Sequence, residues 1–146
     1  MSARTRLADS SMKLMNVAHR ALLKVSRGRL GWAVGSMPVI ELHTVGRSSG
    51  QRRSTMLTAP VHDGNTLVLV ASKGGDDRHP FWYLNLVAQP DIEVTRNGVT
   101  RPMRARTVTA AEKATLWPRI VAAYGGYAAY QNKTDRDIPV VLCEPR

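Results

Sequence analysis

The pattern of apolar and polar positions divides the chain into a helical first part and a strand-rich remainder. In residues 10–29, apolar side chains from Met15 to Val25 recur at spacings of three and four, with lysines and arginines between them. This spacing predicts an amphipathic helix. We expect this basic helix either to pack on the rest of the protein or to lie on an anionic membrane surface. Residues 1–37 are therefore predicted to form a helix and linker, and residues 38–146 the main domain.

Beyond Pro38, short segments rich in β-branched residues follow one another. The segments with strand character are residues 39–45, 52–62, 66–72, 92–95, 99–108 and 138–142. Asp63-Gly64 and Asn97-Gly98 are hairpin signals, because such residues adopt the positive φ that type I′ turns need. Hairpins without regular strand–helix alternation favour an antiparallel barrel over a doubly wound sheet.

Two helical insertions are expected among the strands. Pro80 suits the first turn of a short helix, in which Phe81, Leu84 and Val87 would share one face and Phe81 would lie in the core.

The second insertion begins at a capping box, Thr109-Ala-Ala-Glu112, and is expected to continue to about Ala123. Pro118 should bend or divide this helix. The predicted fold class is therefore mainly β or α+β, with an N-terminal helix and helical insertions.

The charge balance is the strongest compositional signal. Of 146 residues, 21 are Lys or Arg and 11 are Asp or Glu, which gives a net charge of +10 with His neutral. Such a charge attracts nucleic acid, anionic lipid or an anionic small molecule, and composition alone does not choose among them. No stretch approaches the roughly 20 apolar residues of a membrane span. We expect a cytoplasmic protein, because the single Cys143 forms no internal disulfide and no secretory signal pattern is present.

The sequence offers little for metal or nucleophilic catalysis. The four histidines lie far apart and in no metal-ligand spacing such as HExxH. Cys143 lies in an apolar strand, where a buried and inert thiol is expected, and there is no GxSxG motif. We predict no metal site and expect His79 to be a loop or helix-cap residue.

Two turns combine cations with glycines. Residues 46–53 (GRSSGQRR) hold three arginines, two serines and two glycines, and residues 72–75 (SKGG) follow an apolar strand. Glycines let backbone N–H groups approach a phosphate, and guanidinium groups bind its oxygens bidentately. Neither turn matches a P-loop or a Rossmann pattern. Spacing alone leaves two interpretations open: an anion site, or two solvated basic turns.

Three tyrosines, Tyr124, Tyr127 and Tyr130, recur at every third position around Gly125-Gly126. Phenols beside flexible glycines suit the lid of a pocket for a flat ligand better than a tight core. The alternative is that these tyrosines lie on the flank of a helix.

Three ordered motifs give the chain a family resemblance. Residues 42–53 (LHTVGRSSGQRR) resemble the signature LTTxGRxSGxxR, residues 70–86 (VASKGGDDRHPFWYLNL) resemble ASKGGxxxHPxWYLNL, and residues 132–145 (NKTDRDIPVVLCEP) resemble WTDRxIPVVxxEP. These signatures belong to the deazaflavin-dependent nitroreductase family. The resemblance covers residues 42–145 in order.

The resemblance implies a fold and a coenzyme. Members have an antiparallel split β-barrel related to the FMN-binding pyridoxamine-phosphate-oxidase fold, and they bind coenzyme F420, a 5-deazaflavin with a phospholactyl and polyglutamate tail. On this sequence, the residues that would bind the anionic tail are Arg47, Ser48, Ser49, Arg53 and Lys73. The residues that would line the deazaflavin ring are Ser54, Thr55, Met56, Leu57, Thr58, Val70, Ala71, Ser72, Phe81, Trp82, Tyr83, Leu84, Asn85 and Tyr127.

The chemistry implied is a two-electron hydride transfer supplied by the coenzyme. The protein would hold ring and acceptor in contact and stabilise charge on the acceptor. We expect Ser72 and Tyr127 to help position the acceptor, in a pocket completed by Thr58, Tyr124 and Tyr130. The favoured acceptors are menaquinone-like quinones, with nitroaromatics and activated enones as further electron-poor substrates.

The chain departs from the family pattern around the expected acceptor pocket. Gly125-Gly126 stand where relatives often carry Pro-Ser, and Thr58 occupies a position that can be aromatic. A small side chain and flexible glycines predict a wider pocket.

Other functions stay open at this point. A non-catalytic carrier would bind F420 without acceptor-dependent oxidation. An FMN- or haem-binding split barrel is disfavoured, because the basic turns suit a longer anionic tail. A nucleic-acid-binding barrel is disfavoured, because the aromatic residues cluster on helical segments rather than on an exposed sheet. The protein is expected to be a monomer or a homodimer.

Overall fold

The computed structural model describes residues 33–34 and 37–146, so the helix expected in residues 10–29 lies outside the described residues. The strands are β1 (Ala33–Val34), β2 (Met37–Val45), β3 (Arg52–Thr58), β4 (Val61–Asp63), β5 (Thr66–Val70), β6 (Asp91–Arg96), β7 (Val99–Thr107) and β8 (Val140–Pro145). The helices are the 3-10 turn η1 (Lys73–Gly75), α2 (Phe81–Ala88), α3 (Ala110–Ala123) and α4 (Gly126–Lys133).

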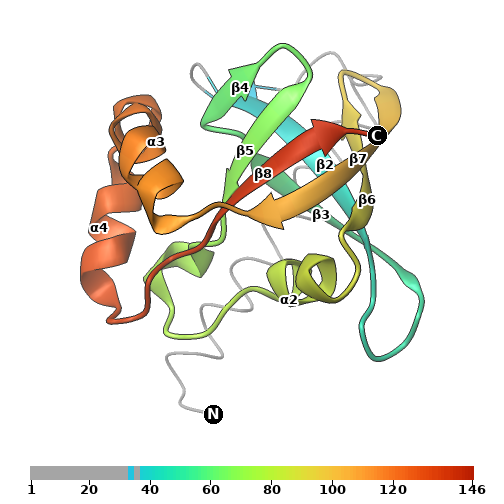
Figure 1. Cartoon of the computed structure of the whole chain (residues 1–146), viewed down its shortest axis with the longest axis horizontal. Coiled ribbons are helices and arrows are strands. Elements are labelled where there is room, and N and C mark those ends of the chain that lie inside the picture. Colours follow the sequence, from blue (N-terminus) through green and yellow to red (C-terminus); the bar gives the residue numbers. More distant parts are fainter. Residues whose placement is uncertain (1–32, 35–36) are drawn as a thin grey trace.

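The described strands form a curled antiparallel sheet, which confirms the expected strand arrangement (Figure 1). Their order is β1-β2-β6-β7-β8-β5-β4, with β3 paired to β2. We call the end of the sheet that carries the β2–β3 turn, η1 and α2 the α2 end. The opposite end, with the β4–β5 and β6–β7 turns, is the hairpin end.

The segment predicted as one strand over residues 52–62 is two strands, so that prediction is wrong. β3 pairs with β2, whereas β4 pairs with β5. The chain changes partner at Ala59-Pro60, where the Ala59 N–H donates to the Pro38 carbonyl at 2.9 Å. Pro60 has no N–H with which to continue the ladder, so the strand ends before it.

The predicted β6–β7 hairpin is confirmed. Asn97 (φ 52°) and Gly98 (φ 79°) both adopt positive φ between the two strands. This is the backbone of a type I′ turn, whose twist matches that of the strands it joins.

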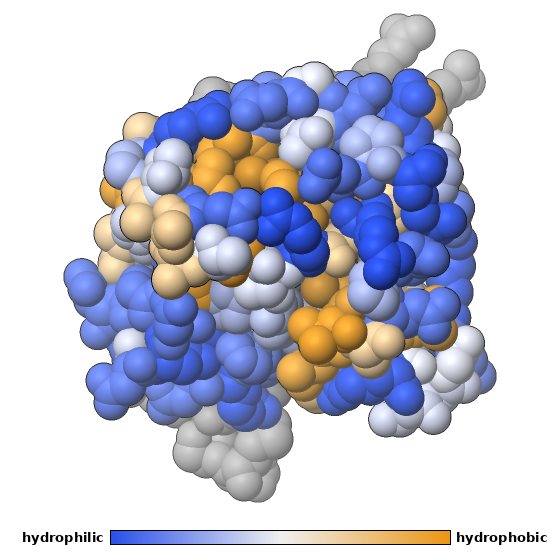
Figure 2. Space-filling model, in the orientation of Figure 1, coloured by the Kyte–Doolittle hydropathy of each residue, from blue (hydrophilic) through white to orange (hydrophobic). Residues whose placement is uncertain are grey.

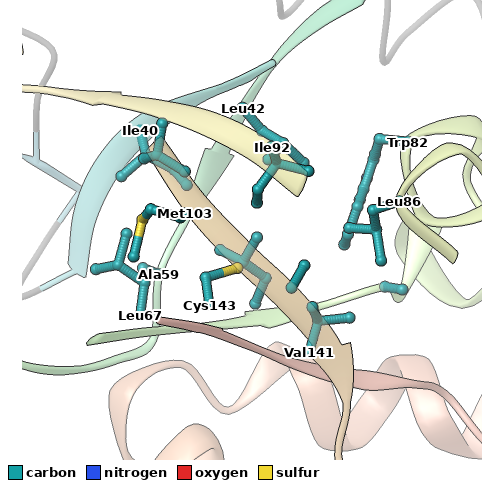
Figure 3. Close-up of a cluster of buried hydrophobic side chains, with 14 residues drawn as sticks. Ile40, Leu42, Ala59, Leu67, Trp82, Leu86, Ile92, Met103, Val141 and Cys143 are labelled. Carbon is teal, nitrogen blue, oxygen red and sulfur yellow. The ribbon is translucent and has the colours of Figure 1, made fainter. Parts of the chain in front are cut away.

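The inner face of the sheet and α2 enclose the main hydrophobic core (Figure 3). Trp82 and Leu86 project from α2 toward Leu42 and Ile92 on the sheet. Leu42 and Leu86 are almost fully buried. Burying a large apolar side chain stabilises the fold by roughly 1.5–3 kcal/mol. These contacts therefore hold α2 against the barrel.

The prediction that Phe81 of α2 lies in the core is wrong. The helix buries Trp82, Asn85 and Leu86, whereas Phe81 and Val87 are 67% and 55% exposed. Phe81 therefore does not lie in the core. The apolar count selected the wrong stripe because the buried stripe contains a polar residue, Asn85, whose amide has hydrogen-bond partners inside the protein.

A second apolar cluster lies where α3 and α4 cover the sheet. It includes Ile120 of α3 and Tyr127 of α4, together with Val140 of β8. The capping box is confirmed, since the Thr109 hydroxyl accepts from the Glu112 N–H at 3.2 Å and the Glu112 carboxylate accepts from the Thr109 N–H at 2.9 Å.

Pro118 lies inside α3, which continues through it as one element, so of the two expected effects, a bend or a division, the division is wrong. A proline lacks the N–H that would pair with the carbonyl of residue 114. Ala114 and Pro118 are both exposed, so water can hydrate that carbonyl. The sequence pattern did not predict α4, because Gly125 precedes the helix and Gly126 is its first residue.

The face of the molecule seen in Figure 1 is hydrophilic over most of its area, with apolar atoms gathered beside α3 and over α2 (Figure 2). Within the described residues, no helix has the length and apolar character needed to cross a bilayer.

Candidate functional site

A cavity of about 620 Å³ lies at the α2 end of the sheet. The β2–β3 turn, η1 and the first turn of α2 surround it. Ten of the predicted coenzyme-binding residues line it: Arg47, Ser48, Ser49, Arg53, Ser54, Thr55, Lys73, Phe81, Trp82 and Asn85. Gly46, from the basic turn of residues 46–53, also lines it, together with Thr44 and Pro80, which were not predicted as site residues. The two basic turns, separate in sequence, therefore share one cavity.

The β2–β3 turn folds tightly on itself. The Gly46 N–H donates to the Gln51 carbonyl, and the Gly50 N–H donates to the Gly46 carbonyl, both at 2.8 Å. A Cβ at Gly46 would lie 2.5 Å from the Ser49 hydroxyl oxygen. Glycine at this position thus lets Ser49 fold over the turn, where its hydroxyl accepts from the Gln51 N–H at 3.2 Å and from Arg53 at 3.4 Å.

Asn85 fixes the position of Arg47. Its side-chain oxygen accepts from the Arg47 backbone N–H at 3.2 Å and from the Arg47 guanidinium at 2.9 Å. Its amide nitrogen donates to the Thr44 hydroxyl at 3.4 Å. Because Asn85 is only 5% exposed, this anchor joins the turn to α2 from inside the protein.

The Phe81 ring contacts one cation from each of the two turns. The Arg47 guanidinium lies 5.4 Å from the centre of its ring, and the Lys73 ammonium lies 5.6 Å from it. Each cation is within the distance of an attractive cation–π contact. The exposed ring thus supports two cations at the cavity, which is a physical reason for its position outside the core.

Arg52 and Arg53 are adjacent in β3 and serve different contacts. Arg52 pairs with Glu93 of β6, whereas Arg53 lines the cavity. Successive side chains of a strand point to opposite faces, so only one of the two faces the cavity.

Arg136 supports the second turn from behind and was missed by the sequence reasoning. Its guanidinium donates to the carbonyls of Ala71, Ser72 and Asp76 at 3.2, 2.9 and 2.8 Å. The matching signal was present in the third motif, which contains Arg136, but its partners lie some 60 positions earlier. It also contacts His79 Nδ1 at 3.2 Å.

His79 lies in the loop before α2, as expected. Burial, with the nearby charge of Arg136, lowers the pKa of His79 below its usual value. The imidazole ring of His79 is therefore uncharged at neutral pH.

Gly75 is required where η1 meets α4. It adopts φ +85°, and a Cβ there would lie 2.8 Å from the Tyr130 carbonyl oxygen. Thr134 adds a contact at this junction by donating to the Asp77 carboxylate at 2.8 Å. The turn that carries Lys73 is thus held by α4 and by the segment that follows it.

The structure does not bring every predicted residue to the cavity lining. The predicted residues outside the described lining are Met56, Leu57, Thr58, Val70, Ala71, Ser72, Tyr83, Leu84, Tyr124, Tyr127 and Tyr130. Ser72 is 8% exposed, and its hydroxyl has no hydrogen-bond partner among the described residues. It lies directly before Lys73, so it connects the buried end of β5 with the cationic turn.

The three tyrosines form one cluster at the junction of α3 and α4. Their ring centres are 5.3 to 6.2 Å apart in edge-on contacts. Tyr127 is buried in the second apolar cluster, and its hydroxyl lies 3.0 Å from that of Thr58. Tyr124 is 44% exposed. The cluster thus connects the end of β3 with α4, and it places Tyr127 inside the protein rather than on an open lid.

The tyrosine hydroxyls are held in their protonated form. Burial raises the pKa of Tyr127 above its usual value. The hydrogen bond with Tyr124 and burial raise the pKa of Tyr130 to about 12. Both phenols are therefore able to donate a hydrogen bond at neutral pH.

The cavity has the chemistry of an anion site. Among the described residues that line it are three cations, Arg47, Arg53 and Lys73, and no Asp or Glu. Hydroxyl groups and a glycine-containing turn complete the set of donors, and Trp82 and Phe81 supply flat apolar surface. Cations, hydroxyls and close backbone suit a phosphate or carboxylate tail, and aromatic walls suit a flat ring. The residues present therefore fit a deazaflavin with an anionic tail.

Metal binding and thiol catalysis have less support in the described residues. They contain no group of three or more His, Cys, Asp or Glu placed to hold a metal ion. Cys143 is fully buried, and burial raises the pKa of its thiol to about 12, so it is the inert thiol that the sequence predicts.

Comparison with known proteins identifies the family. The model of the F420H(2)-dependent quinone reductase family matches residues 16–145. The chain belongs to this family. It is therefore an oxidoreductase whose coenzyme is F420, which confirms the expected family, enzyme class and coenzyme.

Two family members are similar in sequence to this chain along most of their length. The F420H(2)-dependent quinone reductase Rv1261c of Mycobacterium tuberculosis is 39% identical over 135 residues, which are 88% of this chain and 88% of that protein. Another relative from M. tuberculosis, the putative F420H(2)-dependent quinone reductase Rv3178, is 36% identical over 110 residues, 75% of this chain and 92% of that protein.

Solved structures of related proteins confirm the split-barrel fold. An F420-H2 dependent reductase (FDR-A) is 40% identical, with a TM-score of 0.66 over 73% of this chain and 94% of that chain. A protein solved as a domain-swapped dimer is 36% identical, with a TM-score of 0.69 over 88% of this chain and 96% of that chain.

Proposed function

We propose that this family member reduces menaquinone-like quinones with F420H2 bound in the cavity at the α2 end. The observation that carries the proposal is the set of three cations around a cavity without carboxylates. An anionic tail needs fixed cations, and Asn85 and Phe81 restrict Arg47 and Lys73 before any ligand arrives. Restricted donors lose less entropy on binding, which favours affinity.

In this proposal, each element of the cavity has one task. Arg47, Arg53 and Lys73 bind the phosphate and glutamates of the tail, and Ser48 and Ser49 add hydroxyl donors. The edge of β3 and the start of α2 hold the ring and exclude water from one side of it. When bound, the coenzyme supplies a hydride for two-electron reduction. The protein contributes position and charge stabilisation rather than a general base.

The acceptor is proposed to bind between the ring site and the tyrosine cluster. The support is chemical: Tyr127 and Tyr130 are protonated donors, and the buried Ser72 hydroxyl has no partner among the described residues. Such donors stabilise negative charge that develops on a quinone, enone or nitro oxygen. Thr58, whose hydroxyl lies 3.0 Å from that of Tyr127, is proposed to complete this acceptor site.

Acceptor-dependent oxidation of F420H2 tests this proposal. We expect the purified protein to oxidise F420H2 with a soluble quinone, and more slowly with a nitroaromatic or an activated enone, as followed by the absorbance of oxidised F420. Binding of F420 without oxidation above the protein-free rate would instead identify a carrier.

The cellular setting is also a proposal. We infer a cytoplasmic enzyme whose basic segment, residues 1–37, approaches anionic membrane where lipid quinones reside, because each well-placed cation contributes roughly 1 kcal/mol to such binding. Sedimentation with anionic vesicles tests this. Equal sedimentation of the full chain and of a variant without residues 1–29 would contradict it.

A further inference from the structure

A second cavity, of about 390 Å³, lies at the hairpin end of the sheet. The β6–β7 hairpin, the β4–β5 turn and the end of β8 surround it. Figure 1 shows these segments on the opposite side of the molecule from α2. The described lining residues of this cavity share none with the cavity at the α2 end, so the proposed function makes no use of it.

The floor of this cavity is apolar. Leu67, Val94 and Met103 line it and belong to the main hydrophobic core, where each is 2 or 3% exposed. Val99 at the rim is 50% exposed. Core side chains thus form part of the cavity wall.

Two arginines, Arg96 and Arg101, lie on the same face of the hairpin as this apolar floor. In the register of the hairpin, Val94 is opposite Arg101 and Arg96 is opposite Val99. Alternate residues of a strand share a face, so Arg96 shares the face of Val94, and Arg101 shares the face of Met103. Both arginines line the cavity.

These two guanidinium groups differ from the other arginines of the same hairpin. On the outer face of β7, Arg104 pairs with Asp91 at 2.9 Å and Arg106 pairs with Glu112 at 2.8 Å. Arg96 and Arg101 have no hydrogen-bond or ion-pair partner among the described residues. No Asp or Glu is among the described residues that line the cavity.

We propose that this cavity binds a free anionic amphiphile, with its acidic head on Arg96 and Arg101 and its hydrocarbon chain on the apolar floor. The acid neutralises two cations that have no ion-pair partner in the part of the chain that the structure describes, and guanidinium groups bind carboxylates bidentately. The hydrocarbon chain packs on the side chains of this floor, and removal of its own apolar surface from water stabilises the complex. Arg146 at the rim is already bonded to the Met103 carbonyl at 2.9 Å, so it is not assigned to the head group.

Titration of the full-length protein with decanoate, below its micelle concentration, tests this site. We expect saturable binding that R96Q and R101Q each weaken about tenfold, which corresponds to about 1.4 kcal/mol for the lost charged hydrogen bonds. R104Q is the matched control, because it removes the same charge from the outer face of β7, and it should bind decanoate like the wild type. F420 affinity, measured on the same samples, should be equal in all four proteins.

Four results would overturn the proposal. These are non-saturable decanoate binding, equal weakening in R101Q and R104Q, inorganic phosphate binding as tightly as decanoate, and binding to anionic vesicles without binding to free decanoate. The third would remove any role for the apolar floor, and the fourth would assign the arginines to a lipid surface. Because F420 affinity is measured separately, failure of this site is distinguishable from failure of the proposed coenzyme site.

Discussion

At the scale of single residues, Asn85 is the most informative side chain, because one buried oxygen holds both the backbone and the guanidinium of Arg47. Asn85→Leu keeps the branched shape and the number of side-chain heavy atoms and removes that acceptor. We predict about tenfold weaker F420 binding with a smaller change in kcat, together with a loss of about 1–3 kcal/mol of stability from the unpaired groups.

Equilibrium F420 titration and denaturant unfolding check this prediction. Asn132→Leu is the control, because Asn132 is exposed on α4 and outside the described cavity lining. If Asn85→Leu bound F420 like the wild type, Arg47 would not need its anchor, and the assigned role of Asn85 would be wrong.

The residues that carry charge were predictable from the sequence, but their supports were not. Arg47, Arg53 and Lys73 stand out because they lie beside glycines in two turns. Asn85 and Arg136 act through partners about 40 and 60 positions away, and no local spacing predicts such contacts. The resemblance included Asn85 only as a ring-side residue.

At the scale of elements, the capping box of α3 makes stability depend on pH. The hydrogen bond from Arg106 and the backbone N–H of Thr109 lower the pKa of Glu112 from 4.5 to about 2. A group whose folded pKa is lowered stabilises the fold above its unfolded pKa and loses this contribution as pH falls toward the folded value. The loss is therefore expected between about pH 4.5 and 2.

We predict that Glu112→Gln has a lower Tm than the wild type at pH 7, and that the difference shrinks as the pH falls from 4.5 to 2. Gln keeps an oxygen for the Thr109 N–H but carries no charge for Arg106. Asp135→Asn is the control, since Asp135 is exposed and has no ion pair among the described residues. Parallel pH curves for wild type and Glu112→Gln would show that the carboxylate contributes nothing.

Element boundaries followed from the sequence where a local rule decided them. The capping box and the Asn97-Gly98 turn are set by neighbouring residues, and both were correct. The buried face of α2 and the division of β3 from β4 depend on which strands and side chains meet in the folded protein. A hydropathy pattern does not contain that information, because Asn85 is polar and buried while Phe81 is apolar and exposed.

At the scale of the whole molecule, Cys143 reports on the integrity of the barrel. It lies in β8 between Leu67 of β5 and Ala105 of β7 and is fully buried. Because burial raises the pKa of its thiol to about 12, little thiolate exists at pH 8. We predict that a thiol reagent labels the native protein only as fast as the barrel opens.

Labelling followed by mass spectrometry, with and without denaturant, checks this. The unfolded protein should react at the rate of a free cysteine. Equally fast labelling of the native protein would contradict the closed core around β8.

The fold and the coenzyme class were predictable because three motifs lie in order along the chain. The joining of the two basic turns into one cavity was expected only through that resemblance. Composition alone gave the net charge of +10 and left nucleic acid, lipid and small anions equal.

The central claim is that the cavity at the α2 end binds F420 through its fixed cations, and the most direct test is the Kd of F420 for the wild type, Arg47→Gln, Lys73→Gln and Arg104→Gln. We predict that the wild type binds F420 more tightly than FMN, that the first two variants bind about tenfold more weakly, and that Arg104→Gln is unchanged. Wild-type affinity in Arg47→Gln and Lys73→Gln, or a preference for FMN, would contradict the assignment of this cavity.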